Sequence, residues 1–150
     1  MLRQTRKWHS DSLATLSFIS RKELVAIAAV VEIATHARDR PVSAKDMAAR
    51  HKLHSRFFEE ALGYLVTSGV IIGRRGNRLG GYQLARSSEL ISVADIIRAV
   101  SVVRDVAHSD IHPLIEKSAI IPALALAEKE LFFALERITI QQLVPSSEEP

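Results

Sequence analysis

Arginines and glycines gather in one short stretch of this 150-residue chain, GRRGNRLGG at residues 73–81. The stretch holds four of the six glycines of the chain, together with Arg74, Arg75 and Arg78. Guanidinium groups neutralise phosphates, and glycines allow a backbone to approach such an anion closely. The stretch is therefore a candidate site for binding a phosphate backbone, although arginine-rich turns are also common where nothing binds.

A second group of polar side chains, His54, Ser55 and Arg56, stands directly before an apolar stretch with helical spacing. Side chains of these types at the start of a helix can reach the base edges or phosphates of a nucleic acid. We expect Phe57 and Phe58, which follow, to anchor that helix in the core. Since surface histidines without a ligand are common too, the order of the surrounding elements has to decide between these interpretations.

Three serines are each followed three positions later by an acid, the pattern of a helix capping box. The pairs are Ser20 with Glu23, Ser43 with Asp46, and Ser92 with Asp95. The pattern predicts a helix after each serine, and apolar spacing predicts a further helix from residue 55 that ends at Gly69. In the first helix the apolar residues that recur at helical spacing are Leu24, Ile27, Val31 and Ala34. We expect Gly63, inside the helix that starts at residue 55, to permit close helix packing.

The periodicity changes after Gly69. Residues 70–72 and 82–84 are two short β-prone runs on either side of the arginine-rich stretch, which predicts a β-hairpin with a basic tip. Pro122 is expected in a first helical turn, so we predict one long helix over residues 122–144. This helix carries apolar residues at spacings typical of a helix that packs against a partner, namely Leu124, Leu131, Leu135 and Ile138.

Helix, short helix, turn, helix and basic hairpin follow one another in the order of a winged helix-turn-helix, whose second helix of the pair enters the DNA major groove. We therefore predict a mainly α fold with a small β-hairpin, in which a winged helix-turn-helix domain is followed by a long C-terminal dimerisation helix. The predicted divisions are an N-terminal extension over 1–18, the DNA-binding domain over 19–100, a connecting or sensor segment over 101–121, the dimerisation helix over 122–144 and a tail over 145–150.

The charge of the chain is unevenly distributed. Residues 1–90 carry fifteen Lys and Arg against eight acids, a balance of +7, whereas residues 91–150 carry five against nine, a balance of −4, which sum to the net +3. A basic half suggests that this part faces an anion such as nucleic acid. The acidic second half is compatible with dimerisation, which gains nothing from positive charge.

Several classes of protein are excluded or disfavoured. The chain has no cysteine, which rules out disulfides, thiolate nucleophiles and all-thiolate iron–sulfur clusters. The first residues are too polar for a signal peptide, and no apolar run is long enough for a bilayer span, so we expect a cytoplasmic protein without membrane contact. No catalytic motif such as HExxH, GxSxG or GxxxxGK occurs, so we expect no enzyme.

The chain resembles the Rrf-two type of bacterial transcriptional regulators from residue 19 to about residue 144. The segments that carry the resemblance are ISRKELVAIAAVVEIA, LHSRFFEEALGYLVTSGVI, RRGNRLGGYQLAR, ISVADIIRAV and LFFALERITIQQLV. They are similar to the opening helix of the family, its recognition helix, its wing, the helix after the wing and the end of its dimerisation helix. The resemblance implies a homodimeric repressor or activator that binds a palindromic operator in double-stranded DNA.

The resemblance also implies roles for single residues. Phosphate contacts would come from Ser20, Arg21 and Lys22, while Ser43 would lie at the entrance of the helix-turn-helix. His54, Ser55 and Arg56 would reach into the major groove. The wing would contribute Arg75, Gly76, Gly80, Gly81 and Tyr82, to which the charge pattern adds Arg74 and Arg78.

The chain departs from the cluster-binding members of this family. Those members carry three cysteines in the segment after the post-wing helix, and residues 101–117 contain none here, so we expect no iron–sulfur cluster and no other cofactor. His108, Asp110 and His112 lie in this segment and are acceptable ligands for zinc or iron, but a fourth ligand is not visible. We therefore predict no metal site, and a small molecule or a protein as the effector.

The sequence thus predicts a sequence-specific, DNA-binding transcriptional regulator. An alternative of another class is a winged-helix protein-interaction module that docks on an enzyme or on another regulator, because the fold alone does not fix the function. Retention on heparin or random DNA as salt rises distinguishes the two, since only DNA binding releases counterions strongly.

Overall fold

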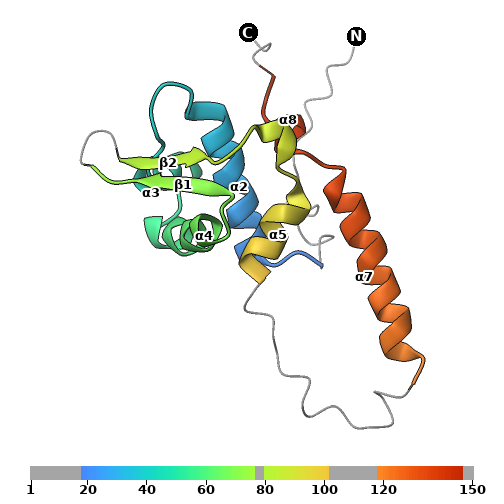
Figure 1. Cartoon of the computed structure of the whole chain (residues 1–150). Helices are drawn as coiled ribbons and strands as arrows, with labels where there is room; N and C mark the ends of the chain where they lie inside the picture. The colour runs from blue at the N-terminus through green and yellow to red at the C-terminus, as the bar shows by residue number, and fades with distance from the viewer. Residues whose placement is uncertain (1–17, 77–79, 102–117, 147–150) are drawn as a thin grey trace, which may run out of the picture.

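The computed structural model of the chain describes residues 18–76, 80–101 and 118–146 (Figure 1). The helical elements are α2 (Arg21–His36), α3 (Ala44–His51), α4 (Ser55–Thr67), the 3-10 turn η1 (Ser88–Leu90), α5 (Val93–Ser101), α7 (Ile120–Glu136) and α8 (Ile140–Leu143). The strands β1 (Ile71–Arg74) and β2 (Gly81–Leu84) form an antiparallel hairpin, the wing. This mainly helical architecture with one hairpin confirms the predicted fold class.

The three predicted capping boxes are formed. At the start of α2, Ser20 Oγ accepts the Glu23 N–H at 3.2 Å, and Glu23 Oε2 accepts the Ser20 N–H at 2.6 Å. Ser43 Oγ accepts the Asp46 N–H at 3.1 Å, and Ser92 Oγ accepts the Asp95 N–H, also at 3.1 Å. Because these bonds satisfy backbone donors that the first helical turn leaves free, they determine where α2, α3 and α5 begin.

Helix α2 is the centre of the core and contacts both α4 and α5 (Figure 1). Its fully buried apolar residues are Ala26, Ala29, Val30 and Ile33. The apolar residues at helical spacing in the sequence, including Ile27 and Val31, are half-buried. The predicted helix is confirmed, and because it packs on more than one side, it buries a wider face than one stripe.

Helix α4 buries Phe58, Leu62 and Leu65 completely. Phe57 remains 44% exposed, so the expectation that both phenylalanines anchor the helix was wrong. Neighbouring helical residues lie about 100° apart around the axis, and Phe57 lies outside the buried face of α4 that Phe58, Leu62 and Leu65 form. The helix ends as predicted, before Gly69, which adopts φ +74°.

The wing is attached to the loop before α3. The Val42 N–H donates to the Tyr82 carbonyl at 3.0 Å, and the Tyr82 N–H donates to the Val42 carbonyl at 2.8 Å. Gly81, with φ +140°, makes this approach possible, because a Cβ there would lie 2.8 Å from the Val42 carbonyl carbon. The base of the wing is thereby fixed relative to α3.

The C-terminal part differs from the prediction of one helix over residues 122–144. Helix α7 begins two residues before Pro122 and ends at Glu136, and a separate short α8 follows. Between them the Val93 N–H donates to the Ile138 carbonyl and the Ile140 N–H donates to the Ile91 carbonyl, both at 2.9 Å. The long helix is interrupted because these backbone groups bond to the segment before α5.

The C-terminal end of α7 packs against α5, whereas its N-terminal part is exposed. Leu135 is buried against α5 beside Val93, Ala94 and Ile97. Residues 120–130 are exposed, and Figure 1 shows this part of the helix standing beside the rest of the molecule. We call residues 120–131 the arm. None of the helices that the structure describes is long and apolar enough to cross a membrane.

Candidate nucleic-acid interface

The N-terminal ends of α2 and α4 bring several of the predicted DNA-binding residues together. The Arg21 guanidinium carbon lies 5.1 Å from the ring centroid of Phe57. Lys22 Nζ lies 3.2 Å from Glu60 Oε1 and 3.8 Å from the ring centroid of Tyr64. Basic residues from the first turn of α2 therefore lie directly against the helix expected to read DNA. The exposed Phe57 has a role that the sequence analysis missed, since it supports Arg21.

The start of α4 presents polar side chains to solvent. His54 is the N-cap residue, is exposed and makes no side-chain capping bond. Arg56 is exposed as well, and Ser55 is half-buried. Ser20, by contrast, uses its hydroxyl to cap α2. The predicted base-reading residues are thus accessible, whereas Ser20 contributes first of all to the structure of the helix end.

The other predicted residues surround a groove between the wing, the start of α3 and one side of α4. Its volume is about 760 Å³. Half of the residues predicted to bind DNA line this groove, namely Ser43, Arg74, Arg75, Gly76, Gly80, Gly81 and Tyr82. Arg78 belongs to residues 77–79, which lie outside the described part of the chain. The fold therefore joins the helix-turn-helix entrance and the wing into one surface.

Six further residues line the groove and were missed from the sequence as site residues: Ala44, Lys45, Glu59, Gly63, Val66 and Gly73. Lys45 could have been found, because it follows the Ser43 cap and so lies in the first turn of α3. The expectation that Gly63 serves helix packing was wrong, because a Cβ added there would meet no atom within 4 Å. The groove-lining residues of α4 give no signal in the sequence, since it does not show where the wing lies.

Some basic side chains in the described part of the chain are neutralised by ion pairs, whereas those at the groove, like the exposed Arg38, Arg40, Lys52, Lys129 and Arg137 elsewhere, are not. Arg50 pairs with Glu32 at 2.8 Å, Arg86 pairs with Asp95 at 3.2 Å, and Arg98 pairs with Glu136. Within the described residues, Lys45, Arg56, Arg74 and Arg75 make no ion pair, and all four are exposed. Unneutralised cations on one surface are suited to an anionic partner.

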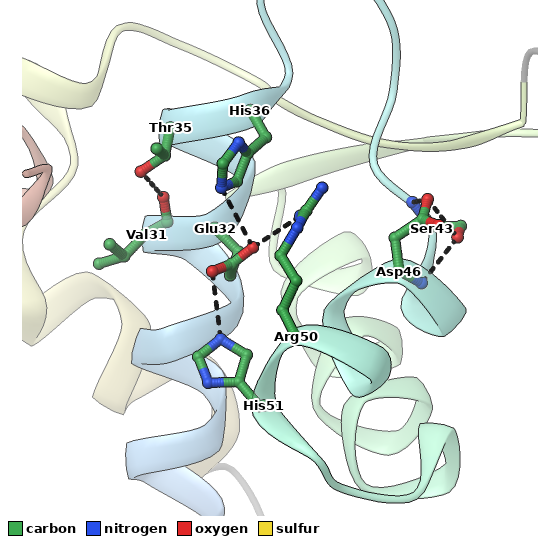
Figure 2. Close-up of polar contacts among 8 residues, drawn as sticks. All are labelled: Val31, Glu32, Thr35, His36, Ser43, Asp46, Arg50 and His51. Carbon is green, nitrogen blue, oxygen red and sulfur yellow. Dashed lines mark hydrogen bonds and ion pairs between the residues drawn. The ribbon is translucent and has the colours of Figure 1, made fainter. Parts of the chain in front are cut away.

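Polar contacts behind this surface hold α3 in place (Figure 2). Glu32 of α2 accepts a hydrogen bond from Arg50 Nη1 at 2.8 Å, and its other oxygen lies 3.2 Å from His51 Nε2. In the cap of α3, the Ser43 hydroxyl donates to Asp46 Oδ2 at 2.8 Å and thereby lowers the pKa of that carboxyl. The contacts of Glu32 attach α3 to α2, and the Ser43–Asp46 contact stabilises the start of α3. Ser43 and Lys45 are thereby held beside the groove.

The residues predicted for dimerisation fall into different environments. Leu124 is 63% exposed and Ile138 is 38% exposed. Leu131 is half-buried, and Leu135 is buried within its own chain against α5. The arm also exposes apolar residues that were not predicted, including Leu126 at 61% and Ile121 at 39%. The uncovered apolar surface therefore lies at the start of α7, further from α5 than the prediction placed it.

A family model described as Rrf2, iron-dependent transcriptional regulator, matches residues 19–146. The chain belongs to the Rrf2 family. This confirms the resemblance drawn from the opening helix, the recognition helix, the wing, the helix after it and the end of the long C-terminal helix.

Similar proteins of the Rrf2 type include a Mycobacterium tuberculosis protein named as an HTH-type transcriptional regulator, 35% identical over 97 residues. That match covers 62% of this chain and 60% of the mycobacterial protein, so this chain spans about three fifths of that relative. The IscR structure of T. potens has a TM-score of 0.68 at 27% identity and covers 87% of this chain and 88% of that one. The structure of CymR, the global cysteine regulator of B. subtilis, has a TM-score of 0.60 at 26% identity and covers 83% and 94%. These names are those of regulators, in agreement with the prediction that the chain is no enzyme.

The description of the Rrf2 family as iron-dependent is not matched by the donor set of this chain. The sequence has no cysteine that could hold a cluster. Among the described residues no group of three or more His, Cys, Asp or Glu is placed to hold a metal. His108, Asp110 and His112 lie outside those residues. A cysteine-ligated cluster does not fit this chain.

Proposed function

We propose that this Rrf2-family chain is a DNA-binding transcriptional regulator that acts as a homodimer on a palindromic operator in the cytoplasm. The observation that carries the proposal is the gathering of exposed, unpaired cations at the wing and at the start of α4, on a fold shared with regulators. Lys45, Arg56, Arg74 and Arg75 would neutralise phosphates or reach bases, and each phosphate contact releases counterions from the duplex.

The shape of the surface supports a docking mode in which α4 enters the major groove. The major groove of B-DNA is about 12 Å wide and admits one α-helix. His54 and Arg56 at the exposed end of α4 would then contact base edges, while Arg74 and Arg75 of the wing contact the neighbouring backbone. Arg21, held over Phe57, would contact a phosphate beside the helix.

The arm supplies the proposed dimer contact. Leu124 and Leu126 are each more than 60% exposed, which is unfavourable in water unless another apolar surface covers them. A second copy of the chain offers the same surface, and a two-fold arrangement then presents two α4 helices. The two half-sites would lie one helical turn, about 34–36 Å, or a multiple of it apart.

We further propose that the regulator works without an iron–sulfur cluster, because the chain has no cysteine. A small molecule or a protein is then the effector. Iron and acid-labile sulfide measured on untagged protein purified without oxygen test this directly. Stoichiometric iron with sulfide would contradict it.

Selection of bound sites from a random DNA pool, combined with sedimentation of the complex, tests the main proposal. We expect an enriched site with two-fold symmetry and two chains per duplex. A protein that stays monomeric and binds no duplex at low ionic strength would overturn it, and capture of a protein partner by the same surface would favour the protein-interaction module.

A further inference from the structure

Gly63 is an anomaly in the middle of α4. Glycine destabilises a helix interior relative to alanine, because it loses more backbone freedom on folding. Neither usual reason for a glycine applies here. Its backbone does not have positive φ, and a Cβ at this position would meet no atom within 4 Å. The fold alone therefore gives no reason why residue 63 lacks a side chain.

Gly63 faces the groove between α4 and the wing. Gly63 lines the groove with Val66, one turn further along α4. Gly73 and Tyr82 of the wing lie opposite, and the Val66 side chain approaches the position of a Gly73 Cβ to 3.8 Å. A side chain on residue 63 would therefore project into the groove.

The charge around the groove favours an anionic occupant. Its lining contains the cations Lys45, Arg74 and Arg75 and a single carboxylate, that of Glu59. None of the three cations makes an ion pair within the described part of the chain. Close to Gly63 on α4 lie the apolar Val66 and, one turn earlier, the Glu59 carboxylate, and the ring of Tyr82 lines the groove from the wing. Such a lining matches a sugar–phosphate strand, which has an anionic edge and apolar sugars.

The position of Gly63 along α4 agrees with a sugar–phosphate strand as the occupant of the groove. Gly63 lies eight residues after Ser55, the first residue of the helix, which is about 12 Å along the axis. The major groove of B-DNA is about 8.5 Å deep. If the first turn of α4 lies at the base edges, Gly63 lies beyond the bases, at the level of the strand that borders the groove.

We propose that Gly63 positions DNA. The missing side chain lets one sugar–phosphate strand of a duplex lie in the groove against α4, where Lys45 and Arg74 contact its phosphates. This rests on the proposed function and extends it to Gly63 and Val66, residues of α4 that carry no recognisable DNA-binding pattern in the sequence.

The test is a size series at residue 63, Gly63→Ala and Gly63→Leu, in the full chain. Affinity is measured on a short random-sequence duplex across a range of salt concentrations, and Tm is measured in parallel. Because the position is helical and open, we expect Gly63→Ala to raise Tm by about 2–4 °C. We expect the same variant to weaken DNA binding several-fold, and Gly63→Leu to weaken it by more than about tenfold (1.4 kcal/mol). The salt slope should fall by about two units in Gly63→Leu, because two phosphates are then no longer neutralised.

Ala49→Leu is the matched control, because Ala49 is an exposed residue of α3 outside the groove lining. It should leave affinity and salt slope unchanged. Binding by Gly63→Leu equal to that of the wild type overturns the inference and leaves the proposed function standing. Weaker binding by Gly63→Leu with a lowered Tm overturns it too if the better-folded Gly63→Ala binds normally. A wild type that binds no duplex overturns the proposed function itself.

Discussion

The body of the molecule, α2 to α5 with the wing, and the arm of α7 leave opposite kinds of surface uncovered. The body exposes unpaired cations at the groove, among them Arg74 and Arg75, and its exposed apolar residues, such as Phe57 and Leu90, lie on different elements. The arm exposes apolar residues such as Leu124 and Leu126. This difference agrees with the proposal that the chain binds DNA through one surface and a second copy of itself through the other. An anion suits the first surface and an apolar surface suits the second.

The largest effect is expected from charging the arm. The double substitution Ile121→Asp and Leu124→Asp, at exposed residues one turn apart on the same side of α7, places two carboxylates where we expect the partner's apolar surface, and desolvating them is costly. The dimer of 33.2 kDa, twice 16.6 kDa, should become a monomer in analytical ultracentrifugation. Affinity for a palindromic site should fall at least about 100-fold, because bivalent binding is abolished.

Leu90→Asp is the control for this pair, since Leu90 is a 68% exposed leucine on the body. It should leave the mass and the affinity unchanged. A double variant that remains a dimer would show that the two surfaces do not have the separate roles assigned to them.

The next largest effect is expected at the wing. Removal of both guanidinium groups by Arg74→Ala and Arg75→Ala should weaken binding to every duplex, because phosphate contacts carry no sequence information. The slope of log affinity against log salt should fall by about 1.8 units, or about 0.9 for each phosphate that is no longer neutralised. Arg98→Ala serves as the control, because Arg98 pairs with Glu136 on the side of α7. An unchanged slope in the wing variant refutes the phosphate assignment.

A smaller and more selective effect is expected at the start of α4. Arg56→Ala should reduce discrimination between the best site and its single-base variants by about 1–3 kcal/mol at the contacted position. Random-sequence affinity should fall much less. Competition assays with a panel of mutated sites measure the difference, and an unaltered ranking of those sites would remove Arg56 from base reading.

The smallest effect is expected in the cap that supports the groove. Ser43→Ala removes the capping box of α3 and should lower the free energy of unfolding by about 1 kcal/mol at neutral pH. The Ser43 hydroxyl lowers the pKa of Asp46 in the folded state, so this stabilisation is present above the ordinary carboxyl pKa. It is lost as pH falls through the lowered value.

Urea denaturation of wild type and Ser43→Ala across acid pH measures this loss. The two curves should converge as the pH falls. Curves that stay parallel would exclude the Asp46 carboxylate as the origin of the effect.

The features that could be predicted from the sequence depend on neighbours along the chain. Each capping box joins a serine to an acid three residues away, so the starts of α2, α3 and α5 are visible in the letters themselves. The glycine and arginine pattern of the wing is local in the same way. These features also carried the resemblance to the family.

The features that were missed depend on residues far apart in the sequence. Helix α7 ends at Glu136 because the backbone at Ile138 and Ile140 bonds to residues 91–93. The spacing of apolar residues alone still predicts one helix over residues 122–144. Phe57 and Phe58 are identical letters, and only the position of the core distinguishes them. The groove that Gly63 lines likewise exists only because the wing and α3 lie beside α4 in the folded chain.

Helix α7 is attached near its C-terminal end, so a small tilt at that end displaces its other end much further. Leu135 and the bonds at Ile138 and Ile140 hold one end against the segment that leads from the wing into α5. The helix is 17 residues long, or about 25 Å. A tilt of about 10° at the attached end displaces the other end by about 4 Å. Small rearrangements beside α5 therefore cause larger displacements at the other end of α7, and in the proposed dimer they would change the spacing between the two α4 helices.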